Sequence, residues 1–207
     1  MSNASSDPTK KHPATVPALG GPKPPIPSNE SQRLSDVLDL NQKDSEVQPS
    51  LIALRDMARS LFDVPIAFVG LIEEHTQRVL TVCVVPPTQK GDNDPLDMWQ
   101  YSTARDCSVC QHTIMEKSHL VIHNLKEFVE SDLGKSYPAE FREDALKLGG
   151  FPVPWPTQDG NVELRPALFY AGAVMQTQSG VKVGTFCIMD IKPRPDFGPE
   201  QLAILES

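Results

Sequence analysis

The residues of this chain whose types and spacing could do chemistry gather in one segment, Asp106–Lys117, with the sequence DCSVCQHTIMEK. Cys107 and Cys110 form a CxxC pair, and His112 follows closely. A CxxC pair can hold zinc when two further ligands converge on it, or it can take part in thiol–disulfide exchange. No second CxxC accompanies it, and the alternative is that Cys110 and Cys187 are small buried core residues.

Other groupings of polar residues allow further interpretations. Ser108 or Cys110 could act as a nucleophile with His112 and Asp190, although the chain contains no Gly-x-Ser-x-Gly segment. His112 could ligate haem or contact a ligand, or it could be a structural histidine bonded to nearby backbone. Asp190 and Arg194 could anchor a ligand or brace a loop as an ion pair. We predict neither a catalytic residue nor a metal site, and we leave the cofactor open.

The composition of the chain argues against several classes of function. Its 207 residues carry a net charge of −8 and no basic patch, so a nucleic-acid partner is not expected. The chain has no run of about 18 apolar residues, and its N-terminus lacks the apolar core of a signal peptide. Four cysteines without a secretory signal favour free thiols over disulfides, and we expect a cytoplasmic protein without a membrane span.

The chain begins with a stretch that cannot form a core. Residues 1–30 are rich in proline and poor in large apolar side chains, so we predict a disordered leader there and one domain over residues 31–207, with a core from about residue 50. Apolar spacing predicts helices over Ser31–Asn41 and Ser50–Phe62. The second helix would bury a face made of Leu51, Leu54, Met57, Ala58, Leu61 and Phe62.

The middle of the chain combines apolar runs with polar loops. Ile66–Ile72 is almost entirely apolar, which predicts a central strand paired with Arg78–Val85. A surface loop over residues 86–95, a short helix capped by Ser108 and a strand over His119–Ile122 follow. We then predict one or two helices over residues 131–149. Residues 150–166 hold four prolines, which predicts an irregular segment within a longer insert at about 126–166.

The end of the chain predicts two strands, a turn and a helix. Phe169–Met175 and Lys182–Ile188 are rich in β-branched and aromatic residues, and Gly180 in the turn between them can take a positive φ. Pro199 suits the start of a helix that the chain end cuts off. Because short links between strands favour antiparallel pairing, we predict an α+β fold, a central antiparallel sheet of five to six strands with helices packed on it.

Several segments, in this order, resemble motifs of the GAF domain, a small-molecule sensor module. The middle segment aligns Cys110 and His112 with the cysteine and histidine of the family's DVSFCAHTI motif. The resemblance covers most of residues 51–205 and is to the sensor subtype common in histidine kinases and cyclic di-GMP enzymes. The matching segments are VPIAFVGLI (64–72), DCSVCQHTI (106–114), LVIHNL (120–125), FYAGA (169–173) and GTFCIMD (184–190).

The resemblance implies a GAF fold and a regulatory sensor or dimerisation domain of a larger signalling protein, without enzyme activity of its own. A small molecule would occupy the concave face of the sheet, with the insert near the pocket mouth. The terminal helices would form a homodimer and relay the signal to an output domain in the same polypeptide. The alternatives are a thiol-dependent enzyme similar to methionine sulfoxide reductases and a ligandless scaffold. The candidate pocket residues are Phe68, Gly70, Cys110, His112, Phe169, Tyr170, Gly172, Cys187 and Asp190.

Overall fold

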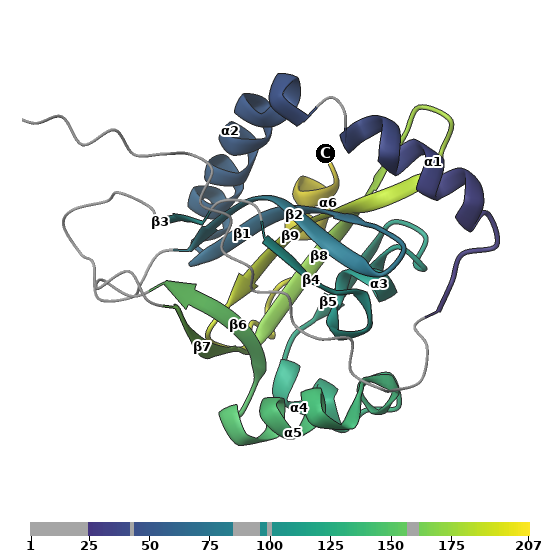
Figure 1. Cartoon of the computed structure of the whole chain (residues 1–207). Coiled ribbons are helices and arrows are strands. Elements are labelled where there is room, and N and C mark those ends of the chain that lie inside the picture. The colour runs from purple at the N-terminus through teal and green to yellow at the C-terminus, as the bar shows by residue number, and fades with distance from the viewer. Residues whose placement is uncertain (1–24, 42–43, 85–95, 99–100, 157–161) are drawn as a thin grey trace, which may run out of the picture.

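An antiparallel sheet lies at the centre of the computed structural model, which describes residues 25–41, 44–84, 96–98, 101–156 and 162–207 (Figure 1). Its strand order is β3-β2-β1-β9-β8-β5, and β4 also pairs with β2, so β3 and β4 share one edge. The predicted α+β architecture is confirmed. The strands of this sheet are β1 (Ile66–Ile72), β2 (Thr76–Val84), β3 (Leu96–Met98), β4 (Tyr101–Ala104), β5 (His119–Ile122), β8 (Phe169–Gln176) and β9 (Lys182–Asp190).

Strand β1 is the predicted central strand, and all seven of its residues are buried. It pairs with β2 on one side and with β9 on the other, both antiparallel. The close approach of β1 and β9 depends on Gly184, because a Cβ atom there would lie 2.2 Å from the carbonyl oxygen of Gly70. A side chain at residue 184 would therefore push the two central strands apart.

Three helices cover one face of the sheet: α1 (Glu30–Asn41), α2 (Asp44–Phe62) and α6 (Pro199–Glu206). In Figure 1 they lie in the upper part of the view. The core between them and the sheet includes the helix residues Val37, Ala58, Phe62 and Leu205, together with Ala67, Val69, Leu71, Phe169, Ala171, Phe186 and Ile188 from the strands.

The opposite face of the sheet is covered by shorter elements. Helix α3 (Cys110–Thr113) follows the 3₁₀ turn η1 (Arg105–Cys107), and α4 (Leu125–Glu130), η2 (Gly134–Ser136) and α5 (Ala139–Leu148) come later in the chain. A separate two-stranded ribbon, β6 (Phe151–Pro156) and β7 (Val162–Ala167), completes this layer. Their shared core with the sheet includes Val109, Ile114, Leu125, Tyr137, Phe151, Val153, Trp155 and Tyr170.

The predicted closing hairpin is present. Strands β8 and β9 pair along their whole length, and Gly180 in the turn between them has a φ of 82°. Only β9 pairs with the central strand, because β8 lies on the outer side of β9 and pairs with β5. Helix α6 starts at Pro199, as predicted.

The second helix differs from its prediction in two ways. It begins at Asp44 rather than near residue 50, and Pro49 lies inside it. Its exposed side carries Leu54, Met57 and Leu61, which were expected to be buried. The helix instead turns Arg55 toward the sheet, where the guanidinium donates to Thr81 Oγ1 at 2.8 Å and to the Val82 carbonyl at 3.0 Å.

The predicted irregular insert is mostly regular structure. Helix α4 occupies its start, and η2 and α5 lie within residues 131–149, where one or two helices were predicted. Gly149 ends α5 in the left-handed conformation with a φ of 74°. The proline-rich segment forms strands β6 and β7 instead of a loop. Proline is tolerated there because a two-stranded ribbon has outer edges whose N–H groups need no partner strand.

Two of the sequence predictions fall largely outside the described residues. These are the leader, of which residues 1–24 are not described, and the surface loop at 86–95. Two short strands that the sequence did not predict, β3 and β4, flank residues 99–100. In the part of the chain that the structure describes, no helix combines the length and apolar character needed to cross a bilayer.

A buried ion-pair cluster fastens α1 to the sheet. The Glu30 carboxylate accepts hydrogen bonds from Arg33 at 2.7 Å and from Arg105 at 2.6 Å, and both arginines are almost fully buried. Arg33 also donates to the carbonyl of Ile72 at the end of β1. Burial raises the pKa of Glu30, but the hydrogen bonds and charges of the two arginines outweigh it and lower that pKa to about 2.

We predict that Glu30→Gln lowers the free energy of unfolding at pH 7 by about 3 kcal/mol, because it leaves two buried guanidinium charges without their carboxylate. The stabilisation by Glu30 is complete above pH 4.5 and is lost as the pH falls toward 2, since the folded pKa is the lower one. Urea unfolding across this range measures both effects. The exposed Glu74→Gln is the matched control, and an equal loss of stability in both variants would contradict the assignment.

Candidate functional site

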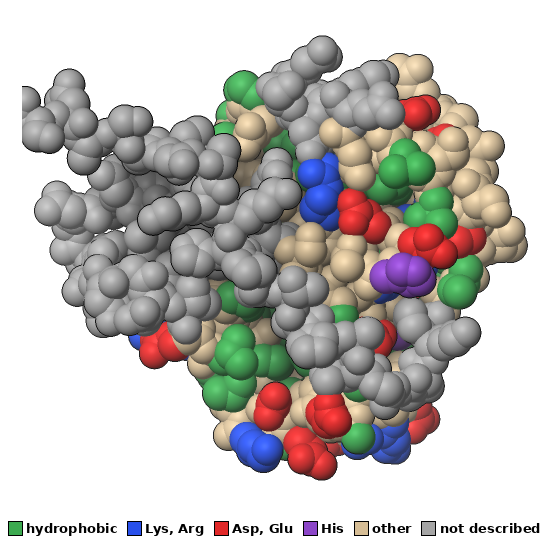
Figure 2. Space-filling model, viewed as in Figure 1, with side chains coloured by type: hydrophobic (Ala, Val, Ile, Leu, Met, Phe, Trp, Pro, Cys, Tyr) green, Lys and Arg blue, Asp and Glu red, His purple; other side chains and the backbone are tan. Residues whose placement is uncertain are grey.

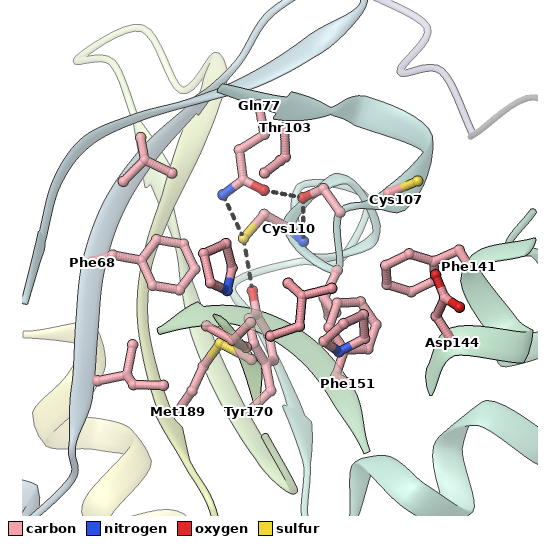
Figure 3. Close-up of a pocket in the computed structure, with 18 residues that line it drawn as sticks. Phe68, Gln77, Thr103, Cys107, Cys110, Phe141, Asp144, Phe151, Tyr170 and Met189 are labelled. Atoms are coloured by element: carbon pink, nitrogen blue, oxygen red, sulfur yellow. Dashed lines mark hydrogen bonds between the residues drawn. The ribbon is translucent and has the colours of Figure 1, made fainter. Parts of the chain in front are cut away.

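A cavity of about 180 Å³ lies between the sheet and the layer formed by α5, the β6–β7 ribbon and the segment before α3 (Figure 3). Its volume is comparable to the roughly 150 Å³ of an engineered protein cavity that binds benzene. The lining residues are Ile66, Phe68, Gln77, Val79, Thr103, Cys107, Ser108, Val109, Cys110, Phe141, Asp144, Phe151, Pro152, Val153, Pro154, Leu164, Tyr170 and Met189.

The walls of the cavity are mostly apolar. Phe68 and Met189 come from the central strands, and Phe151, on the opposite side, comes from β6, as does Val153. Asp144 on α5 is the one charged side chain among the described residues that line it. In the space-filling view, hydrophobic side chains show over the β6–β7 ribbon, and the charged side chains of the lower edge lie below them (Figure 2). Such walls favour an uncharged ligand.

Polar groups gather at one end of the cavity and bond to one another (Figure 3). The Gln77 amide donates to the Cys110 sulfur at 3.3 Å, and its carbonyl accepts from the Ser108 hydroxyl. The Ser108 hydroxyl accepts from the Cys110 backbone N–H at 3.1 Å, which caps the first turn of α3. The Tyr170 hydroxyl donates to the Cys110 sulfur from the other side at 3.4 Å.

Cys187 lies directly behind this polar end, on β9. Its sulfur is 3.5 Å from the Cys110 sulfur and 3.2 Å from the Tyr170 hydroxyl. The Cys187 thiol donates to Thr185 Oγ1 at 3.1 Å, and Thr113 bonds to the Tyr170 hydroxyl at 2.7 Å. Four elements, β2, α3, β8 and β9, therefore meet around two sulfur atoms.

The cysteines differ in how readily they ionise. Burial raises the pKa of Cys110, but its hydrogen-bonding interactions with Cys187, Thr185, Tyr170 and Ser108 outweigh burial and bring that pKa to about 7. Burial, together with Cys110, raises the pKa of Cys187 well above its ordinary value. Burial and the Asp106 carboxylate raise the pKa of Cys107 to about 12. Within the CxxC pair, Cys110 is thus the thiol that carries nucleophilic character.

The geometry separates the two cysteines of the CxxC pair. The sulfur of Cys107 points away from that of Cys110, on the other side of the loop that joins them (Figure 3). Cys110 instead meets Cys187, which is far away in the sequence. Among the residues that the structure describes, no three histidine, cysteine or acidic side chains come together as metal ligands.

Three of the nine candidate residues, Phe68, Cys110 and Tyr170, line the cavity. Cys187 lies behind it, as described above. Gly172 faces the same side of β8 as Tyr170, because a Cβ atom there would lie 2.2 Å from the tyrosine hydroxyl. Gly70 likewise leaves room for the Gln77 amide, because a Cβ atom at residue 70 would lie 2.9 Å from its nitrogen. Both glycines thus leave room for polar side chains of the site.

His112 does not line the cavity. It lies on α3 and is buried, with its ring 5.0 Å from that of Tyr137, and its Nε2 atom lies 3.3 Å from the Gln111 amide nitrogen. Burial lowers the pKa of His112 to about 4, so the imidazole is neutral at pH 7 and accepts a hydrogen bond from the amide. This matches the interpretation of a structural histidine.

Phe169 and Asp190 were expected at the pocket, but they lie on the opposite face of the sheet. Successive residues of a strand point to opposite faces, and Tyr170 and Met189 occupy the cavity side. Phe169 packs on Phe197 beneath α2 and α6, with ring centroids 5.0 Å apart. Asp190 accepts from Arg194 at 2.6 Å, and Arg194 reaches the carbonyl of Phe62 at the end of α2. This ion pair braces the helical layer.

Several residues that shape the cavity did not stand out in the sequence. Gln77 falls between the predicted strands Ile66–Ile72 and Arg78–Val85, and Val153 and Leu164 fall in the predicted irregular segment. A signal for the β6 residues was present, because Phe151, Val153 and Trp155 alternate with prolines at the period of a strand. Nothing in the local sequence around Gln77 points to Cys110, which is 33 residues away.

The sequence matches no protein-family model and no curated protein. Solved structures similar to this fold include a domain of a protein described as a two-component sensor histidine kinase from Sinorhizobium meliloti 1021, at 12% identity and a TM-score of 0.44, over 76% of this chain and 82% of that one. The phycoerythrobilin-bound GAF domain of a cyanobacterial phytochrome is similar at 10% identity and a TM-score of 0.41, over 86% of this chain and 89% of that one. The chromophore-binding domain of an unusual bacteriophytochrome from R. palustris is similar at 11% identity and a TM-score of 0.42. This match covers 82% of this chain and 56% of that one. These similarities concern the fold.

We predict that the buried, neutral His112 makes the protein less stable as the pH falls. Between pH 6.5 and 4 the unfolded chain binds a proton that the folded imidazole does not, so the free energy of unfolding falls by on the order of 3 kcal/mol across this window. His112→Gln removes this slope in urea unfolding experiments. The exposed His75→Gln leaves it in place, and an unchanged slope between pH 6.5 and 4.5 in His112→Gln would refute the assignment.

Proposed function

We propose that this chain is a GAF-like sensor domain whose cavity binds a small, uncharged and mostly apolar molecule. The observation that carries the proposal is a cavity with mostly apolar walls and a cluster of hydrogen-bonding groups at one end. Apolar area supplies affinity in such sites, and a few polar groups orient the ligand. The side chains of Gln77, Ser108 and Tyr170 are placed to bond to one polar atom of the ligand.

The same walls favour binding over catalysis on an amino acid. A thiol-dependent reduction of free methionine sulfoxide needs partners for the ammonium and carboxylate groups of the substrate. Asp144 is the single charged side chain among the described residues around the cavity, so a carboxylate would have no cation to bind. The cavity is also too small, in this conformation, for a tetrapyrrole such as the one bound by the similar cyanobacterial domain.

We propose that occupancy of the cavity is relayed through β8 to the helical layer. Tyr170 lines the cavity, and the next residue back, Phe169, faces the other side and packs on Phe197. A ligand that shifts Tyr170 therefore also shifts Phe169, whose ring packs in the core beneath α2 and α6. Glu206 at the end of α6 is also tied to His119 on β5 at 2.6 Å. The signal would leave through these helices to an output domain such as a histidine kinase or a cyclic di-GMP enzyme.

We also propose that two copies of the chain associate through α2. We place the protein in the cytoplasm, because its cysteines are free thiols and the cytoplasm keeps thiols reduced. Leu54, Met57 and Leu61 are exposed on this helix at spacings of three and four residues. This is the spacing of a coiled-coil seam, in which a helix packs against a second copy of itself.

We predict that toluene and phenol, as probes, bind to the cavity and shift the ¹³C-methyl NMR signals of Val153 and Met189, but not that of Val183 in the other core cluster. Phenol, which can also bond to the polar end, should bind more tightly, by roughly threefold to tenfold for one hydrogen bond. Val153→Phe fills the cavity and should abolish the shift of the remaining Met189 signal with both probes.

Leu146→Phe, on the exposed side of α5, is the matched control and should bind both probes normally. Equal shifts at Val153 and Val183, or binding that survives Val153→Phe, would argue against a ligand cavity.

We predict that the chain is dimeric in analytical ultracentrifugation and that Met57→Glu with Leu61→Glu makes it monomeric, because a buried charge opposes the helix contact. Leu146→Glu places the same change at an exposed leucine of α5 and should leave the dimer intact. A wild-type monomer at all concentrations up to the millimolar range would rule out this contact.

A further inference from the structure

The Cys110–Cys187 pair is not explained by ligand binding alone. Both sulfurs are fully buried and 3.5 Å apart, although the residues come from different elements and are distant in the sequence. A disulfide bond is about 2.05 Å long, so the two atoms need to approach by about 1.5 Å to join. The pair is therefore close to bonding distance in the reduced protein.

Access to the two sulfurs is unequal. Cys110 lines the cavity, whereas Cys187 lies behind it and does not. A reagent that enters the cavity meets the Cys110 sulfur first. The Gln77 amide and the Tyr170 hydroxyl both donate to this sulfur, and donated hydrogen bonds stabilise a thiolate. The site thus has a nucleophilic thiol, Cys110, at the cavity surface and a second thiol, Cys187, behind it that can react with the first.

We propose that the cavity admits a small alkyl hydroperoxide to Cys110 and that Cys110 and Cys187 then form a disulfide. The inference rests on the proposed sensor function and names a class of molecule that the cavity would sense. Apolar walls suit the alkyl group, and the Gln77 amide and the Ser108 hydroxyl, which line the cavity next to Cys110, can bond to the peroxide oxygens.

The chemistry balances in two steps. The Cys110 thiolate attacks the terminal oxygen of the hydroperoxide, an S–O bond forms, the O–O bond breaks, and the departing alkoxide takes up a proton to become an alcohol. The Cys187 sulfur then attacks the Cys110 sulfenic acid, an S–S bond forms, and the hydroxyl group leaves with the Cys187 proton as water. Two thiols lose two electrons in total, and the hydroperoxide is reduced to an alcohol and water.

The disulfide would change the layer that faces the cavity. Cys110 is the first residue of α3, so closing the sulfur–sulfur distance draws this helix toward β9. In the disulfide the Cys110 sulfur is no longer a thiolate. It therefore no longer accepts hydrogen bonds as a thiolate from the Gln77 amide and the Tyr170 hydroxyl. Because Tyr170 also supports the β8 route to the helical layer, oxidation and ligand binding would act on the same relay.

The test treats the reduced full chain with tert-butyl hydroperoxide, blocks remaining thiols by alkylation and maps the peptides by mass spectrometry. The expected result is one intramolecular disulfide that joins Cys110 and Cys187. In Cys187→Ser the reaction should stop at a sulfenic acid on Cys110 that dimedone traps, and Cys110→Ser should give neither product. Cys83→Ser changes another buried cysteine and should form the disulfide at the wild-type rate.

Two further measurements keep the test decisive. Val153→Phe should slow the oxidation by about tenfold because it fills the cavity, whereas Leu146→Phe should not. Oxidation first at Cys107 or Cys83, no disulfide in the wild type, or an unchanged rate in Val153→Phe would overturn the proposal. If toluene still shifts the Val153 methyl signal in that event, the cavity remains a ligand site and the redox inference alone has failed.

Discussion

The structure depends on the fact that its central strand is apolar on both faces. Every residue of β1 is buried, so the sheet needs a covering layer on each side. On one side the helices α1, α2 and α6 provide this layer, and its core holds large side chains such as Phe62 and Phe169. On the other side the cover consists of a four-residue helix, two short helices and a two-stranded ribbon. The cavity lies where these shorter pieces meet over the sheet.

The polar end of the cavity follows from the same arrangement. Buried polar groups need partners, and Gln77, Cys110 and Tyr170 find them in one another because β2, α3 and β8 converge there. Two glycines make the convergence possible, since any side chain at residue 70 or 172 would meet Gln77 or Tyr170. The motif segments matched by the sequence resemblance therefore supply both glycines together with Cys110 and Tyr170, whereas Gln77 lies outside those segments.

Local patterns were enough to predict the central strands of the sheet, but not its edge strands β3 and β4 and not the site. The apolar run of β1 and the glycine turn of the closing hairpin depend on near neighbours, and both are present as predicted. The β6–β7 ribbon was missed because its prolines suggested a loop. Pro152 faces Pro166, so neither residue of this pair could donate a ladder hydrogen bond. With prolines at every second residue of β6, the missing N–H groups all lie on its outer edge, and the alternate residues Phe151, Val153 and Trp155 enter the core.

The pairing of cysteines shows most clearly what sequence spacing leaves out. Spacing directs attention to Cys107 and Cys110, but a side chain's partners are set by the faces to which its element turns it. The loop before α3 turns the Cys107 sulfur away, while β9 presents Cys187 to the cavity side and Ile188 to the helices. The same alternation sends Phe169 and Asp190 to the helical face. Strand register thus decides that the Cys110 sulfur lies near Cys187 rather than Cys107. Register depends on the whole sheet rather than on any motif within it.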